Sequence, residues 1–184
     1  MSNLEELAKQ PLPNANELAG RFPAQPHDHK ADEATYREVM QKLAFGQAFS
    51  DYMAHALWTK DGGWQEKDLR PYGPLPVYPG TSVLHYGQEV FEGLKAYRRA
   101  DNTIWLFRPA FNANRFNQSA RRMALPEIPV EDFVGSCVDL VRADARWVPV
   151  KDGATLYLRP FMYASESFLG VHPAHEVTLS LIHI

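Results

Sequence analysis

Cysteine is nearly absent from this chain: Cys137 is the only one among 184 residues. A single thiol excludes an internal disulfide framework and any metal site built from several cysteines. Long apolar runs are also lacking, because no segment approaches the length that spans a bilayer, and residues 1–9 lack the apolar core of a secretion signal. These absences predict a reducing compartment, a cytoplasmic location and no membrane partner.

Neither sign of charge dominates, since the formal net charge is -3. The chain therefore lacks both the basic excess of a nucleic-acid binder and the long acidic runs of a disordered tail. It also lacks a nucleotide-binding glycine pattern, a phosphate loop and a histidine pair at a familiar metal-ligand spacing. Charge and the common motifs thus indicate no nucleic-acid partner and assign no chemistry by themselves.

Residues 1–33 are rich in proline, asparagine, aspartate and histidine and show no sustained hydrophobic periodicity. We predict a polar extension that lies on other structure or stays mobile, with at most a short helix at residues 4–7. His27, Asp28 and His29 offer metal ligands, but adjacent polar residues on such a segment are usually only solvated. We expect no metal site here.

Three segments have the periodicity of helices. From residue 33 onward, apolar residues recur at i, i+3, i+4 and i+7, and we expect Gly46 to end that helix. Pro109 suits the first turn of a second helix, in which Arg115 and Ser119 share a face. A third helix, bracketed by Pro129 and Pro149, carries an apolar stripe typical of core packing. The apolar positions of the first and third helices are Tyr36, Val39, Met40 and Leu43, and Phe133, Cys137, Leu140, Val141 and Trp147.

The remaining periodic segments are predicted strands. Residues 51–59 begin a β-hairpin, because residues 60–63 supply turn chemistry. Residues 69–80 contain four prolines and must run along a sheet edge or as a loop. Further strands are expected at 103–107, 155–163 and 176–181, with 165–175 as a loop between the last two. This order of elements predicts an α+β fold with a mainly antiparallel sheet and flanking helices.

Arg159 lies in an otherwise apolar strand, between Leu158 and Pro160. An unpaired buried charge costs several kcal/mol, so this arginine needs an anionic partner. A carboxylate of the protein itself meets that need as well as a ligand does, and the sequence pattern leaves both open.

Residues 84–97 read Leu-His-Tyr-Gly-Gln-Glu-Val-Phe-Glu-Gly-Leu-Lys-Ala-Tyr. This segment closely resembles the signature of the branched-chain amino-acid aminotransferases. Other segments agree with that family in order and spacing, and the resemblance covers roughly residues 43–182. These further matches are Phe45 with Gly46, Asp51 with Met53, 106–109 with Asn114 and Arg115, 147–149, 156–160, and Glu166 with 169–171.

The resemblance implies the small N-terminal domain of a fold type IV enzyme that uses pyridoxal 5'-phosphate. On that basis residues 1–33 are the extension, 34–175 the small domain, and 176–184 the last strand and the start of the interdomain region. The large C-terminal domain is then absent from this chain. Family members convert Leu, Ile or Val and 2-oxoglutarate, so amino acids and 2-oxo acids are the implied partners.

The resemblance also implies roles for particular residues. Arg115 matches the arginine that holds the cofactor phosphate. Arg159 matches the arginine that receives the side-chain carboxylate of glutamate or 2-oxoglutarate, and we expect both guanidinium groups to reach one cavity beside Tyr157. The implied substrate-binding residues are Phe45, Tyr86, Phe91, Tyr157, Arg159 and Val171.

Tyr86 and Val171 face the neighbouring subunit's site in the family, which implies a homodimer. The Schiff-base lysine that bonds the cofactor belongs to a segment beyond Ile184, so this chain is expected to hold no catalytic residue and to be inactive alone. One alternative is a non-catalytic anion-binding or regulatory module. Another is a different fold type IV enzyme, such as a D-amino-acid aminotransferase or an aminodeoxychorismate lyase, because fold alone does not fix the substrate.

Overall fold

The computed structural model describes residues 14–183, so the short helix expected at 4–7 lies outside the described residues. Within them, one seven-stranded sheet has the order β2-β1-β7-β6-β4-β5, with β3 paired to β6. Every pair is antiparallel, as the sequence predicts. The strands are β1 Tyr52–Thr59, β2 Gly63–Pro71, β3 Glu89–Phe91, β4 Leu94–Arg98, β5 Ile104–Leu106, β6 Leu156–Ala164 and β7 Glu176–His183.

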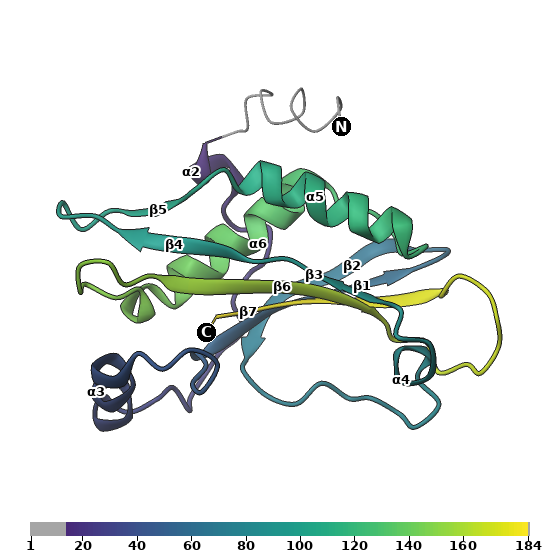
Figure 1. The fold of residues 1–184 in the computed structure, drawn as a ribbon, viewed down its shortest axis with the longest axis horizontal. Helices are drawn as coiled ribbons and strands as arrows, with labels where there is room; N and C mark the ends of the chain where they lie inside the picture. Colours follow the sequence, from purple (N-terminus) through teal and green to yellow (C-terminus); the bar gives the residue numbers. More distant parts are fainter. Residues whose placement is uncertain (1–13, 184) are drawn as a thin grey trace.

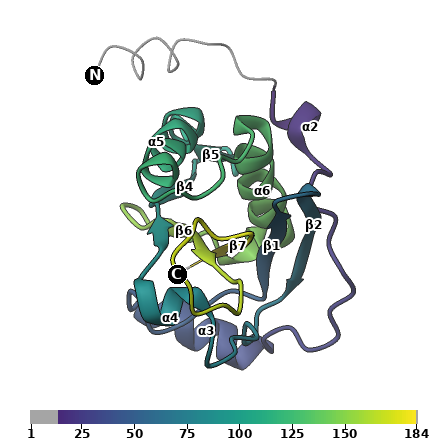
Figure 2. The ribbon, with the colours of Figure 1, turned by 90° about the vertical axis from the view of Figure 1, so that its right-hand side faces the viewer.

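Helices lie on both sides of this sheet. In Figures 1 and 2, α5 and α6 cover one face, and α3 and α4 lie on the opposite side. The helices are α2 Ala15–Leu18, α3 Glu33–Lys42, α4 Ser82–Tyr86, α5 Pro109–Arg122 and α6 Val130–Ala143, followed by the 3-10 turn η1 Ala145–Trp147. The arrangement is the predicted α+β fold.

The core fills the space between the sheet and the α5–α6 layer. Phe116 of α5 and Phe133 of α6 are buried there with ring centroids 5.4 Å apart, against Leu158 of β6. The predicted stripe of the third helix is therefore core, and Pro109 stands at the start of α5 as expected. Burial of this apolar layer is the main force that holds the sheet to the helices.

The hairpin prediction is confirmed, because β1 and β2 pair across the turn 60–62, and Gly63, the first residue of β2, has φ +65°. β2 is an edge strand that ends at Pro71, and a loop follows it. The proline-rich segment therefore lies where few backbone N–H groups are needed for pairing, so the N–H groups that proline lacks cost little stability. The first predicted helix ends earlier than expected. Leu43, not Gly46, takes the left-handed conformation that terminates α3, and its N–H donates to the carbonyl of Val39.

The segment 14–33 lies on α6 and on the edge strand β2. Asp139 of α6 accepts hydrogen bonds from the backbone N–H groups of Gly20 and Phe22, at 2.8 and 2.9 Å. Phe22 is fully buried, and Ala24 forms a bridge with Leu69 of β2. The described part of the predicted extension therefore lies on other structure, which was one of the two expected outcomes. A domain boundary at residue 33 stays a prediction.

The loop 165–175, predicted between the last two strands, is bonded to the start of α4. Ser82 donates its backbone N–H to the carbonyl of Glu166 at 2.9 Å and its hydroxyl to the carbonyl of Phe168 at 3.0 Å. The signature segment 84–97 forms most of α4 and then β3 and β4. The loop and the signature segment are therefore neighbours. Among residues 14–183, no helix has both the length and the apolar character needed to cross a bilayer.

Candidate functional site

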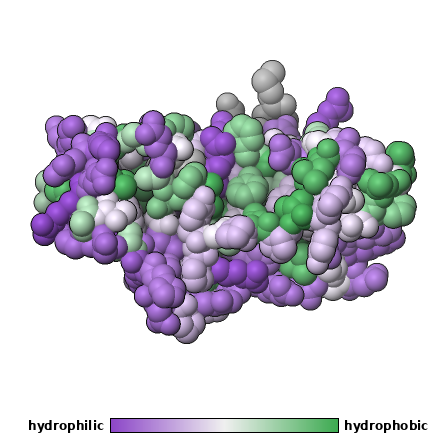
Figure 3. Space-filling model, turned by 90° about the horizontal axis from the view of Figure 1, so that it is seen from below, coloured by the Kyte–Doolittle hydropathy of each residue, from purple (hydrophilic) through white to green (hydrophobic). Residues whose placement is uncertain are grey.

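Side chains along β6 alternate between the core and the opposite face of the sheet. Leu156 and Leu158 are buried in the core, whereas Tyr157 and Arg159 are partly exposed. The ring of Phe45, which follows α3, meets the ring of Tyr157 edge-on at 5.2 Å. Tyr157 and Arg159 therefore lie on the α3 side of the sheet, which Figure 3 shows as a mainly polar face with apolar patches.

Arg159 is held by aromatic groups. Its Nη2 donates to the phenol oxygen of Tyr157 at 3.1 Å, and its guanidinium carbon lies 4.4 Å from the ring centroid of Phe91. No carboxylate lies within ion-pair distance of Arg159 in the part of the chain that the structure describes. The sequence left two possible partners for Arg159, a carboxylate of the protein or a ligand. Residues 14–183 offer no such carboxylate, so the guanidinium is available to another anion.

Arg115 lies on α5, on the other side of the sheet, and pairs with Glu92. Its Nε and Nη2 both donate to the Glu92 carboxylate, the Nη2 bond measuring 2.6 Å, and this pairing raises the pKa of the guanidinium. Glu92 is 4 % exposed and also accepts the N–H of Gly93 at 2.6 Å. The Arg115 side chain is 53 % exposed, and its remaining N–H donors, including those on Nη1, are not used by Glu92.

Glu92 and Gly93, between β3 and β4, connect the surroundings of the two arginines. The N–H of Glu92 donates to the carbonyl of Pro160 in β6 at 2.8 Å. A Cβ on Gly93 would lie 2.1 Å from the phenol oxygen of Tyr157, so only glycine lets that ring approach. One short segment therefore orients Arg115 through a carboxylate and makes room for the tyrosine that contacts Arg159.

Replacing Gly93 by alanine should displace the Tyr157 phenol and with it the Arg159 guanidinium. Because a phenol is rigid and already bonded to Arg159, we expect a loss of about 1–3 kcal/mol in the free energy of unfolding, as for other overpacked positions. Chemical denaturation of the natural polypeptide that carries these residues measures it. Gly73→Ala is the matched control, because an added Cβ there meets only the Pro71 carbonyl, at 3.9 Å. Equal stability changes in both variants would show that Gly93 is not a close-approach position.

Of the other implied wall residues, Phe45 and Phe91 are exposed and Tyr157 is partly exposed. Phe45 and Tyr157 line a cavity of about 340 Å³ together with Lys95 of β4, and neither Arg115 nor Arg159 lines it. Phe91, on β3, is exposed beside Arg159. The structure thus brings Phe45, Phe91, Tyr157 and Arg159 into one group, while a single cavity that holds both arginines stays a prediction.

Tyr86 and Val171 are both on the surface. Tyr86 ends α4 and is half exposed, and Val171 is 98 % exposed in the loop 165–175. The hydrogen bonds from Ser82 to this loop place both residues on connected segments.

Sequence reasoning missed the positioning residues Glu92 and Gly93. Both stand in the signature segment, but no periodicity indicates that Glu92 is buried or that its partner is an arginine 23 residues later. A glutamate next to a glycine in a mostly apolar segment was the available signal.

A curled sheet of antiparallel strands with flanking helices matches the fold of the N-terminal domain in class IV aminotransferase structures. The branched-chain amino acid aminotransferase of Escherichia coli superimposes with a TM-score of 0.55 at 20% identity, over 73% of this chain and 39% of that chain. The branched-chain aminotransferase of the archaeon Thermoproteus uzoniensis, solved with norvaline, gives a TM-score of 0.52 at 23% identity, over 71% of this chain and 40% of that chain.

By sequence, the chain is homologous to the N-terminal part of the branched-chain-amino-acid aminotransferases. It is 46% identical over 158 residues to a probable member from Streptomyces coelicolor, which is 85% of this chain, and 42% identical over 141 residues to the cytosolic enzyme of Caenorhabditis elegans, which is 77% of it. The chain spans 44% of the first relative and 34% of the second. No family model matches it.

Proposed function

We propose that the natural polypeptide carrying these residues is a branched-chain amino-acid transaminase that uses pyridoxal 5'-phosphate. It transfers the amino group of Leu, Ile or Val to 2-oxoglutarate. The observation that carries the proposal is the 46% identity over 158 residues to an aminotransferase of this kind. The relatives reported above are all named branched-chain enzymes, which favours this substrate class over D-amino acids.

The residues present fit a phosphate-bearing cofactor. Arg115 offers a half-exposed guanidinium whose orientation is set by a buried carboxylate, and its unused N–H donors suit a dianion. In this proposal Arg115 holds the phosphate, and Glu92 keeps the arginine in place. The cofactor, when bound, supplies the electron sink for proton removal at the amino-acid α-carbon.

Two kinds of substrate need opposite surroundings, an apolar wall for Leu, Ile or Val and a cation for glutamate and 2-oxoglutarate. The rings of Phe45, Phe91 and Tyr157 offer the wall. Arg159, without a carboxylate among the described residues, offers the cation at the edge of that wall. We therefore assign Arg159 and Tyr157 to the side-chain carboxylate of the dicarboxylic substrate.

The proposal extends to assembly and location. Exposed Tyr86 and Val171, on segments bonded to each other, support a homodimer in which each chain completes its neighbour's pocket. A cytoplasmic location is supported by the single cysteine and by the cytosolic relative from Caenorhabditis elegans.

Glutamate formation from 2-oxoglutarate tests the proposal directly. The natural polypeptide, supplied with pyridoxal 5'-phosphate, should form glutamate with L-leucine, L-isoleucine and L-valine, and kcat/KM with D-alanine should be lower by at least about 100-fold. Turnover with D-alanine but not L-leucine would indicate a D-amino-acid aminotransferase. No turnover with either donor would favour the binding module.

A further inference from the structure

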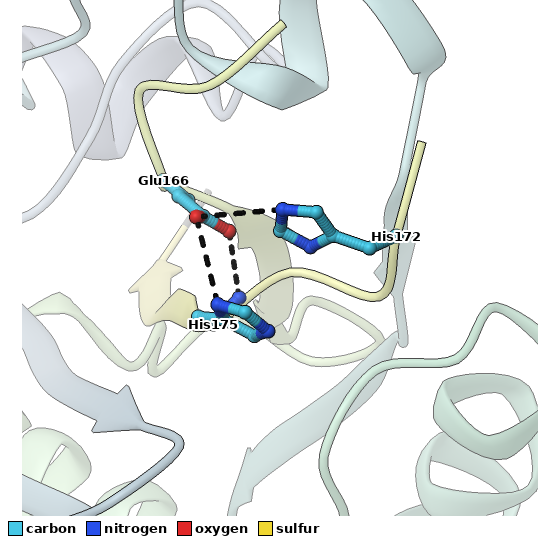
Figure 4. A group of neighbouring side chains, drawn as sticks. All are labelled: Glu166, His172 and His175. Atoms are coloured by element: carbon cyan, nitrogen blue, oxygen red, sulfur yellow. Dashed lines mark hydrogen bonds and ion pairs between the residues drawn. The ribbon is translucent and has the colours of Figure 1, made fainter. Parts of the chain in front are cut away.

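The loop 165–175 gathers two imidazoles and a carboxylate outside the site described above. Figure 4 shows Glu166, His172 and His175 turned toward one another. One ligand atom from each lies within 4.8 Å of the other two, and among the described residues this is the only such group. Oε1 of Glu166 lies 3.9 Å from Nε2 of His172 and 3.8 Å from Nδ1 of His175.

Hydrogen bonds orient His172 and Glu166 as in a metal site. Nδ1 of His172 lies 2.8 Å from the carbonyl of Pro173, which only accepts, so Nδ1 carries the proton and Nε2 keeps its lone pair toward Glu166. The N–H of His175 donates to Oε2 of Glu166 at 2.7 Å, which leaves Oε1 available. A neutral imidazole lone pair that faces a carboxylate is repelled by it, and either a proton on that nitrogen or a metal ion between the two groups removes the repulsion.

Packing keeps the two rings on the same side. The imidazoles of His172 and His175 stack with centroids 4.4 Å apart at 21°, and Phe168 packs on His172 at 4.4 Å. In a tetrahedral zinc site, neighbouring ligand atoms lie about 3.3 Å apart. Each of the two Oε1–N distances therefore needs to shorten by about half an ångström around an ion, and the stacked rings must rotate until the lone pairs in their planes point at it.

We propose that Glu166, His172 and His175 bind a divalent transition-metal ion, for which Zn²⁺ is the test ion. The ligands are Oε1 of Glu166, Nε2 of His172 and Nδ1 of His175, with water in the fourth position, since all three side chains reach the surface. All three ligands lie in one loop, so a bound ion cross-links the segment that presents Val171. This site uses neither Arg115 nor Arg159 and does not depend on the proposed transaminase activity.

Lys60 is the cation next to this site. Its Nζ lies 3.5 Å from Nε2 of His175. The ammonium group can donate a hydrogen bond to this nitrogen, and its positive charge repels a metal ion at Nδ1 of the same ring. Metal binding through Nδ1 places the proton on Nε2, so the lysine must swing away. Removing this charge should strengthen binding.

Zn²⁺ titration of the tag-free natural polypeptide against a chelating dye tests the proposal, and Co²⁺ absorption reports the coordination. We expect one ion per chain. The affinity for Zn²⁺ should fall more than about 100-fold in His172→Ala, His175→Ala and Glu166→Gln. Even the loss of a residue that only hydrogen-bonds to a metal ligand lowers metal affinity about 10- to 100-fold. His29→Ala and His85→Ala, which change surface histidines elsewhere, are the matched controls.

In Lys60→Gln the affinity for Zn²⁺ should rise about 3- to 10-fold at low salt, because a repelling charge is removed. A misfolded variant would lose affinity, so this increase cannot result from loss of folding. The proposal is overturned if no ion binds, if His172→Ala and His175→Ala retain it, or if the control variants lose it equally. Unchanged or weaker binding in Lys60→Gln also overturns it. Thermal unfolding of each apo variant confirms that the fold is intact.

Discussion

The Arg159→Ala variant of the natural polypeptide should lose most of its use of glutamate and 2-oxoglutarate while keeping most of its use of leucine. Arg159 has no carboxylate among residues 14–183, so its guanidinium is available to a second carboxylate on the substrate. A charged hydrogen bond contributes about 1.5–3 kcal/mol, and kcat/KM for 2-oxoglutarate should therefore fall about 10- to 100-fold. Single-turnover kinetics with each amino acid separate the two half-reactions.

Two further variants sharpen this result. Arg159→Lys keeps the charge but not the fork of donors, so it should restore only part of the glutamate activity. Arg37→Ala removes an exposed arginine on α3 whose one ion pair among residues 14–183 is with Glu33, and it should change neither half-reaction. Equal losses with leucine and glutamate in Arg159→Ala would contradict the role of Arg159 in selecting the dicarboxylic substrate.

Arg115→Ala should weaken binding of pyridoxal 5'-phosphate by about 100-fold, because the variant removes the guanidinium that the proposal assigns to the phosphate. Glu92→Gln should weaken it less, about 3- to 10-fold. The amide still fills the space beside Arg115 but no longer holds both donors by charge. Equilibrium dialysis of the cofactor measures both values.

Arg121→Ala is the control for these variants. Arg121 lies on the same helix and pairs with Glu127 at 2.6 Å, but both side chains are at the surface and outside the candidate site. Its removal should leave the cofactor affinity unchanged. An Arg115→Ala protein that binds the cofactor as tightly as Arg121→Ala would show that the phosphate is held elsewhere.

Local patterns in the sequence were sufficient to predict much of the fold. The hairpin of β1 and β2, the start of α5 at Pro109 and the apolar stripe of α6 follow from turn chemistry, proline geometry and period. The end of α3 did not follow, because Leu43 adopts a left-handed conformation that side chains seldom take and Gly46 was the expected stop.

The candidate site was predictable only in part. The resemblance to a known family indicated Arg115, Arg159 and the rings of Phe91 and Tyr157, but not the carboxylate that holds Arg115. The Glu92–Arg115 pair joins a strand connection to a helix, and the approach of Tyr157 to Gly93 depends on how β6 lies beside it. The same limit applies to Glu166, His172 and His175, whose meeting depends on loop conformation rather than on a helical or strand period.

The proposed function assigns different anionic groups to two arginines, a phosphate to Arg115 and a carboxylate to Arg159. A crystal structure of the natural polypeptide with pyridoxal 5'-phosphate and glutamate tests this most directly. We predict the phosphate against Arg115, still paired with Glu92, and the glutamate side-chain carboxylate against Arg159 and Tyr157. A phosphate bound away from Arg115, or a glutamate side chain that leaves Arg159 without an anion, would contradict it.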